Sequence, residues 1–92
     1  MYNQFIEIGT IKSIEILREG ENPKGIITLS VVRDFKNSTG EYEHDDLPIE
    51  INNVLCDIIE DHFEEKMKIG VKGRILLRNN QIVLIGERFI SL

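Results

Sequence analysis

The feature that most constrains this chain is a hydrophobic pattern that repeats every two residues and is interrupted once by a helical spacing. Residues 26–34 show the two-residue period most clearly. There Ile27, Leu29 and Val31 fall on one face of an extended strand, and polar residues fall on the other. Such a segment predicts a strand with one face in a core and one face in water.

Four further segments have the same period. Residues 4–17 predict a strand with a kink near Gly9 or Lys12, because Ile11 has the opposite parity to the other isoleucines. The others are a short strand at 47–51, in which Pro48 indicates an edge or a bulge, and two longer strands at 67–78 and 81–91.

Polar segments connect these strands. Residues 19–25 form a loop rich in turn-forming residues, and residues 36–46 predict a polar, flexible hairpin loop. Asn79-Asn80 can adopt the positive backbone angles of a tight two-residue hairpin turn.

The helical spacing lies between the third and fourth strand segments. Asn52 or Asn53 is the expected N-cap, and the helix should end near Lys66. Its apolar residues recur three and four positions apart and predict one stripe, formed by Val54, Leu55, Ile58, Ile59 and Phe63. Three strands, one helix and two strands is the order of the five-stranded OB-fold barrel. We therefore expect an all-β, single OB-fold domain over residues 1–92, with one α-helix between strands three and four.

The charge is unevenly distributed. The formal net charge of -5 by itself argues against a nucleic-acid partner, because phosphate repels an acidic surface. However, residues 66–92 hold six Lys/Arg and one acid, whereas residues 50–65 hold six acids and no Lys or Arg. The total therefore excludes little. An acidic helix should face away from any bound strand, and binding should be weak and sensitive to salt.

Several classes are excluded by composition. No run of about 18 apolar residues exists, so no membrane span is expected. The first residues do not have the pattern of a signal peptide. Cys56 is the only cysteine, which excludes a disulfide framework and a thiolate metal site and favours the reducing cytoplasm.

Three motifs resemble the bacterial single-stranded-DNA-binding protein family. They are Met1-x-Asn3 followed by an apolar strand into Gly9, the run from Arg33 to Glu41, and the run from Ile69 to Ile75. The resemblance extends in register over nearly the whole chain. It implies an OB-fold and binding of single-stranded DNA in replication, repair or recombination.

The chain also departs from that family. The hairpin at Asn79-Asn80 is short, the acidic C-terminal tail is expected to be absent, and Asn52 or Asn53 stands where the family often has tryptophan. These features resemble the reduced, tail-less form of the primosomal replication protein B type. The resemblance implies a homo-oligomer, a dimer rather than a tetramer, and replication or primosome proteins as partners. The strand expected to pair with its copy comprises Asn3, Gln4, Phe5, Ile6, Glu7 and Ile8.

Binding of single strands needs cations along a groove and flat faces for stacking. One face of the strand at 67–78 carries a basic stripe, formed by Lys68, Lys72, Arg74 and Arg78. Arg33 and Lys36 would contact the ligand from the other side. Phe35 has two possible roles. It could stack on a base, or it could pack in the core, because it falls on the same strand face as Val31. The predicted binding residues are Arg33, Phe35, Lys36, Tyr42, Lys68, Lys72, Arg74 and Arg78. The alternative for Tyr42 is an exposed loop residue with no role in binding. The alternative for the basic residues is an outward strand face that is simply in contact with water.

No catalytic or metal site is predicted, and no cofactor. The best candidate, Glu43-His44-Asp45-Asp46, is interpreted as an acidic solvated loop, because four adjacent residues rarely converge on one ion. His62 is expected to be partly buried, and Cys56 to be an inert core thiol. Two functions compete: a non-enzymatic module that binds single-stranded DNA without strong sequence preference, and an OB-fold dimerisation or adaptor module with weak or lost DNA binding. The sequence does not distinguish RNA binding from DNA binding, because stacking and phosphate contacts serve both.

Overall fold

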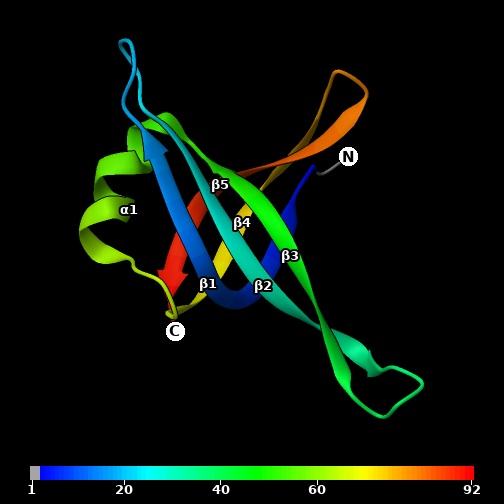
Figure 1. Ribbon diagram of the computed structural model, residues 1–92. Coiled ribbons are helices and arrows are strands. Elements are labelled where there is room, and N and C mark those ends of the chain that lie inside the picture. Colours follow the sequence, from blue (N-terminus) through cyan, green and yellow to red (C-terminus); the bar gives the residue numbers. More distant parts are fainter. Residues whose placement is uncertain (1–2) are drawn as a thin grey trace.

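Five strands close into a barrel in a computed structural model that describes residues 3–92 (Figure 1). Met1 of the first motif lies outside the described residues. The strand order around the barrel is β1-β2-β3-β5-β4. The expected all-β barrel, with its helix between the third and fourth strands, is confirmed. The elements are β1 (Phe5–Leu17), β2 (Lys24–Lys36), β3 (Tyr42–Ile51), a 3-10 turn (Asn53–Leu55), α1 (Cys56–His62), β4 (Lys68–Arg78) and β5 (Gln81–Ser91).

The first strand closes the barrel because it pairs with two neighbours. Residues 5–10 pair with β4, and residues 10–17 pair with β2. The register with β2 shifts between Ile11 and Ser13, so the predicted kink lies at Lys12. On the other side, a short parallel ladder joins Ile49–Ile51 of β3 to Leu84–Gly86 of β5.

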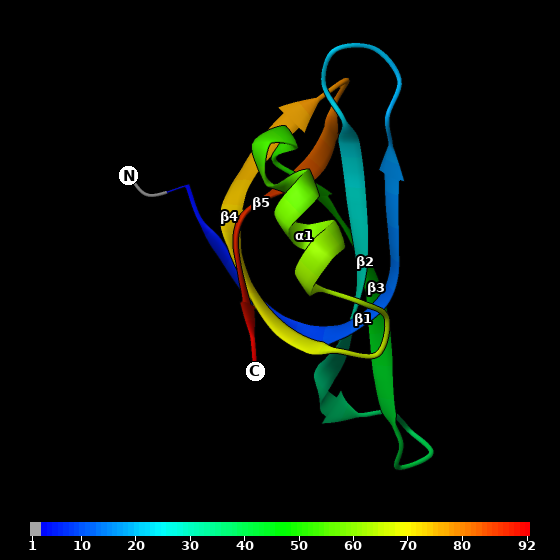
Figure 2. The same cartoon turned by 90° about the vertical axis from the view of Figure 1, so that its left-hand side faces the viewer.

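The core lies inside the barrel and is closed by the helix. Alternating residues of the strands, including Ile27, Leu29 and Val71, are fully buried, as the two-residue period predicts. Cys56 and Ile59 of α1 join the same cluster. Figure 2 shows α1 lying between the β1–β2 side and the β4–β5 side of the barrel. No helix in residues 3–92 is both long and apolar enough to cross a membrane.

The helix is shorter than the sequence predicts. Asn52 caps the 3-10 turn that precedes α1, and its side chain accepts a hydrogen bond from the Val54 amide at 3.3 Å. The N-cap of α1 itself is Leu55, not an asparagine, and it makes no side-chain capping bond. The helix ends at His62, not near Lys66, because the Lys66 amide turns back to the Ile11 carbonyl at 2.8 Å. His62 is exposed, not partly buried.

The expected apolar stripe is also wrong in part. Val54 is 75% exposed and Ile58 is 53% exposed. The chain first makes a 3-10 turn, whose residues are spaced differently from those of an α-helix. The buried side chains are therefore Cys56 and Ile59, with Leu55 and Phe63 partly covered.

The predicted loop at 36–46 is mostly strand. β2 extends to Lys36 and β3 begins at Tyr42, so only residues 37–41 form the turn. The Asn37 side chain organises this turn by accepting hydrogen bonds from the Thr39 and Glu41 amides, both at 3.0 Å. Beyond the barrel both faces of this hairpin lie in water, so its strands can be polar.

We predict that two glycines of β4 differ sharply in their tolerance of alanine. A Cβ at Gly73 would overlap the backbone oxygen of Ile85, whereas a Cβ at Gly70 would meet nothing within 4 Å. Gly73→Ala should lower the free energy of unfolding by about 2 kcal/mol or more, because the core cannot absorb the added atom. Gly70→Ala is the matched control and should change it by less than about 0.5 kcal/mol. Urea unfolding measures both, and equal effects would contradict the close packing at Gly73.

Candidate nucleic-acid interface

A groove of about 730 Å³ lies on the outer surface of the barrel. Its walls include the start of β2 next to the β1–β2 loop and the β4 arm of the β4–β5 hairpin, which rise on either side in Figure 1. Strand pairing places Ile26, Glu50 and Ile85 side by side across its floor. Asn52 and Asn53 also line it.

Three cations line this groove. Arg74 and Arg78 come from β4, and Lys24 comes from the start of β2. Arg78 donates a hydrogen bond to Glu50 at 2.8 Å, and Arg74 lies 3.7 Å from Glu87. In residues 3–92, Lys24 has no carboxylate within ion-pair distance. The groove therefore has two more cations than carboxylates.

Sequence reasoning missed Lys24. It follows a loop of turn residues, and only the closed topology brings it opposite Arg74 and Arg78. The signal that the sequence offers is the position of Lys24 at the end of the predicted loop 19–25.

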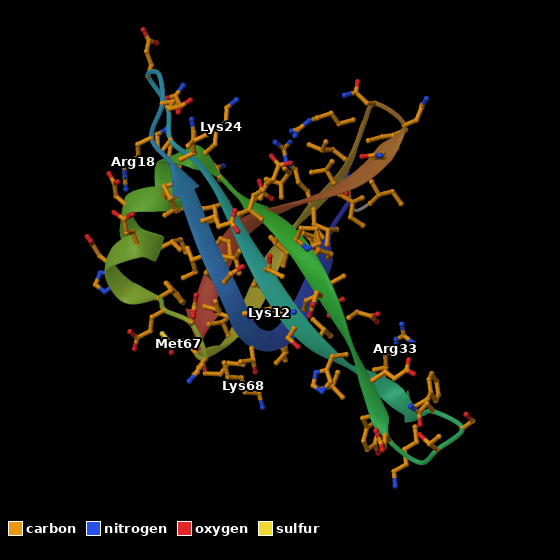
Figure 3. All side chains as sticks on the ribbon, in the orientation of Figure 1. Lys12, Arg18, Lys24, Arg33, Met67 and Lys68 are labelled. Atoms are coloured by element: carbon orange, nitrogen blue, oxygen red, sulfur yellow. The ribbon has the colours of Figure 1, made fainter. Side chains whose placement is uncertain are left out.

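The predicted basic stripe on β4 is divided between two surfaces. Lys68, Lys72, Arg74 and Arg78 share the outward side of the strand, but only the last two line the groove. Lys72 lies opposite Ile6 and Arg88, on the outer face of β1, β4 and β5. Figure 3 shows Lys68 at the opposite end of the barrel from Lys24.

Arg33 is held by two carboxylates at the β2–β3 hairpin (Figure 3). Its guanidinium donates to Asp45 at 2.8 and 3.0 Å and to Glu43 at 2.5 Å. The hydrogen bonds to Asp45 raise the pKa of Arg33, and those same bonds lower the pKa of the Asp45 carboxyl. The charge of Arg33 is therefore already compensated within the hairpin.

The aromatic residues of this hairpin are exposed. Phe35 is 82% exposed, so the core-packing alternative for it is wrong. The reason is its place beyond the end of the barrel, where the register with β3 shifts between Val32 and Lys36. Lys36 pairs with Tyr42 across the hairpin, with its ammonium 5.7 Å from the ring centroid. Tyr42 lies in a strand, not in a loop.

The four residues 43–46 belong to β3 and do not converge. Glu43 and Asp45 contact Arg33 on one face. On the other face, His44 lies 3.2 Å from the Ser30 hydroxyl, and Asp46 forms an ion pair with Lys12 at 2.6 Å. A strand sends successive side chains to opposite sides, which separates these groups.

The first strand has one free edge. Residues 5–9 pair with β4, and pairing with β2 begins only at Thr10. Of the residues predicted to pair with a second copy, Ile6 and Ile8 point outward and are exposed. Two others have roles inside the chain: Phe5 is buried, and the Asn3 side chain bonds to both backbone groups of Ile75, at 2.5 and 2.8 Å. Gln4 is exposed and Glu7 is partly so.

Solved structures with the same fold include two single-stranded DNA-binding proteins and a PriB domain. A small single-stranded DNA-binding protein from Streptomyces coelicolor has a TM-score of 0.74 and 10% identity, with 100% of this chain and 95% of that chain covered. Plasmodium falciparum SSB, in complex with ssDNA, has a TM-score of 0.73 and 20% identity, covering 100% and 96%. The dimeric N-terminal domain of PriB from Thermoanaerobacter tencongensis has a TM-score of 0.69 and 17% identity, covering 98% and 96%.

These likenesses establish the fold: the chain is an OB-fold barrel like those of SSB and PriB proteins. No protein-family model matches the sequence, and no curated protein matches it.

We predict that Cys56 resists thiol reagents in the folded protein. The residue is fully buried, and this burial raises the pKa of its thiol, so the reactive thiolate is scarce at pH 7. Ellman's reagent should react only as fast as the chain opens, and at once in guanidinium chloride. Rapid labelling of the native protein at pH 7 would contradict a core position for this thiol.

Proposed function

We propose that this protein is a non-enzymatic module that binds single-stranded DNA without strong dependence on sequence. The observation that carries the proposal is the groove between the β1–β2 loop and the β4–β5 hairpin, in which Lys24, Arg74 and Arg78 outnumber one carboxylate. OB-folds bind oligonucleotides on this face of the barrel. A strand of phosphates would gain from each cation that it neutralises.

The net charge of -5 is compatible with this proposal. None of the acids of α1 lines the groove, and two of them, Asp57 and Glu60, bind Arg18 at 2.8 and 3.0 Å. The negative charge of the helix therefore lies outside the groove. Repulsion over longer distances remains and weakens binding at low salt, where screening is slight.

The β2–β3 hairpin would supply the second part of the site. Phe35 and Tyr42 offer exposed rings, and Lys36 adds a cation beside the ring of Tyr42. A strand that leaves the groove along the outer face of β2 and β3 would reach these rings, on which bases can stack. Arg33 would position the hairpin, since its charge is compensated. Lys68 and Lys72 belong to this path only if the strand also wraps around the barrel.

We further propose that the protein forms a homodimer through the free edge of β1, in preference to a tetramer. Within the part of the chain that the structure describes, main-chain groups of residues 5–9 on that edge have no partner strand, and an unpaired edge is a template for a second copy. The PriB domain of the same fold is dimeric. Action in the cytoplasm, in replication, repair or recombination and with replication or primosome proteins as partners, belongs to the same proposal.

The alternative function is that of a dimerisation or adaptor module with weak or lost DNA binding. It is favoured by the exposed apolar residues Val54 of the 3-10 turn and Ile58 of α1, and by the carboxylates that pair with Arg33 and Arg78. Under this alternative, oligonucleotides would not bind and a protein partner would cover the helix.

The first test is a titration with labelled oligo-dT at several salt concentrations. The affinity should fall steeply with salt, because each neutralised phosphate releases a counterion. Arg74→Ala should lower the slope of log affinity against log salt by about 0.7 to 1 unit. Lys68→Ala, at the other end of the barrel, is the matched control and should leave the slope unchanged unless the strand wraps. Absence of binding at low salt would exclude the proposal and leave the adaptor function.

The second test separates stacking from charge. Phe35→Ala should weaken binding to oligo-dT by about 1–3 kcal/mol, the contribution of one stacked base, without changing the salt slope. Phe35→Tyr keeps a flat ring and should retain most of the affinity. If both variants bind as the wild type does, the hairpin is not part of the site.

A further inference from the structure

The groove contains one group that a site for phosphates alone would not need. Glu50 lies on its floor, with 34% of its side chain exposed. Its neighbours across the strands are Ile26 of β2 and Ile85 of β5. A carboxylate in this position repels the backbone of a nucleic acid, so it lowers affinity unless it contacts something else.

The geometry of Glu50 leaves an acceptor available. Arg78 donates to Oε2 at 2.8 Å and so fixes the carboxylate. Within residues 3–92, Oε1 has no hydrogen-bond partner. A strong acceptor is therefore held on the floor of the groove, beside the exposed side chain of Ile26, on which the flat side of a base can rest.

A purely structural role explains this residue poorly. The ion pair with Arg78 is half-exposed, and such pairs contribute little to stability. The same pair also reduces the charge that Arg78 can offer to phosphate. Glu50 thus costs binding strength in a groove whose other charged side chains are cations.

We propose that Glu50 is a specificity-determining residue that makes the groove prefer bases with an exocyclic amino group, cytosine above thymine or uracil. This inference rests on the proposed function and refines it. A carboxylate accepts from the N4 amino group of cytosine. Thymine and uracil carry an oxygen at that position, which would face the carboxylate as a second acceptor. The preference would act at the one base seated over Glu50, within otherwise unselective binding.

Oligo-dC and oligo-dU of equal length provide the sharpest comparison, because their sugars and phosphates are identical and both bases are pyrimidines. At pH 7.5 and fixed salt, the wild type should bind oligo-dC about three- to tenfold more tightly, the range expected for one hydrogen bond that forms in competition with water. Glu50→Gln keeps the shape of the side chain but can present either a donor or an acceptor. This variant should bind both oligonucleotides with nearly equal affinity, and oligo-dU more tightly than the wild type does.

Glu87→Gln is the matched control. It also removes one negative charge beside an arginine, but Glu87 does not line the groove. It should raise both affinities and leave their ratio unchanged. Thermal melting of both variants checks that the barrel is intact.

The outcomes are distinct. Equal binding of both oligonucleotides by the wild type would overturn the role of Glu50 and leave the proposed function standing. A preference for oligo-dC that persists in Glu50→Gln, or that disappears in Glu87→Gln as well, would also overturn it. Binding of neither oligonucleotide would refute the proposed function and this inference together.

Discussion

The barrel depends on the ability of β1 to pair with two strands at once. The bulge at Lys12 turns the strand so that one half lies beside β4 and the other half beside β2. At the turn, Ile11 exchanges backbone hydrogen bonds with Lys66 and Met67, at 2.8 and 2.9 Å. These bonds fix the chain where the segment that contains α1 ends, directly before the start of β4. The register of β4 in turn places Arg74 and Arg78 across from Lys24.

Ion pairs neutralise many of the acidic side chains in this molecule. The acids of the hairpin bind Arg33, the first acids of α1 bind Arg18, and Asp46 binds Lys12. The excess negative charge of the sequence therefore does not translate into a uniformly acidic surface. The groove keeps a local surplus of cations because only one carboxylate shares its floor.

The order of elements and the buried parity of the strands could be predicted from the sequence, since both follow from local periods. Ile27, Leu29, Ile69 and Val71 are buried as that period requires. Lys24 could not be assigned to a site, because its neighbours in space are fixed by barrel closure. Polar composition at 42–46 suggested a loop, since the cross-strand ion pair of Arg33 with Asp45 cannot be seen in a single segment. Val54 and Ile58 were misplaced for a different reason: the first turn of the helix is a 3-10 turn.

The ion pairs of Arg33 with Glu43 and Asp45 have a consequence for the free energy of ligand binding. Hairpins that protrude from a barrel commonly lose conformational freedom when they close on a ligand, and this loss reduces affinity. Here the guanidinium and the Asn37 side chain already hold both arms of the hairpin and its turn. The backbone segments that carry Phe35 and Tyr42 are therefore joined to each other on both sides of the turn in the free protein. Arg33 need not touch the ligand, yet it would strengthen binding by reducing the conformational freedom of the hairpin in the free protein.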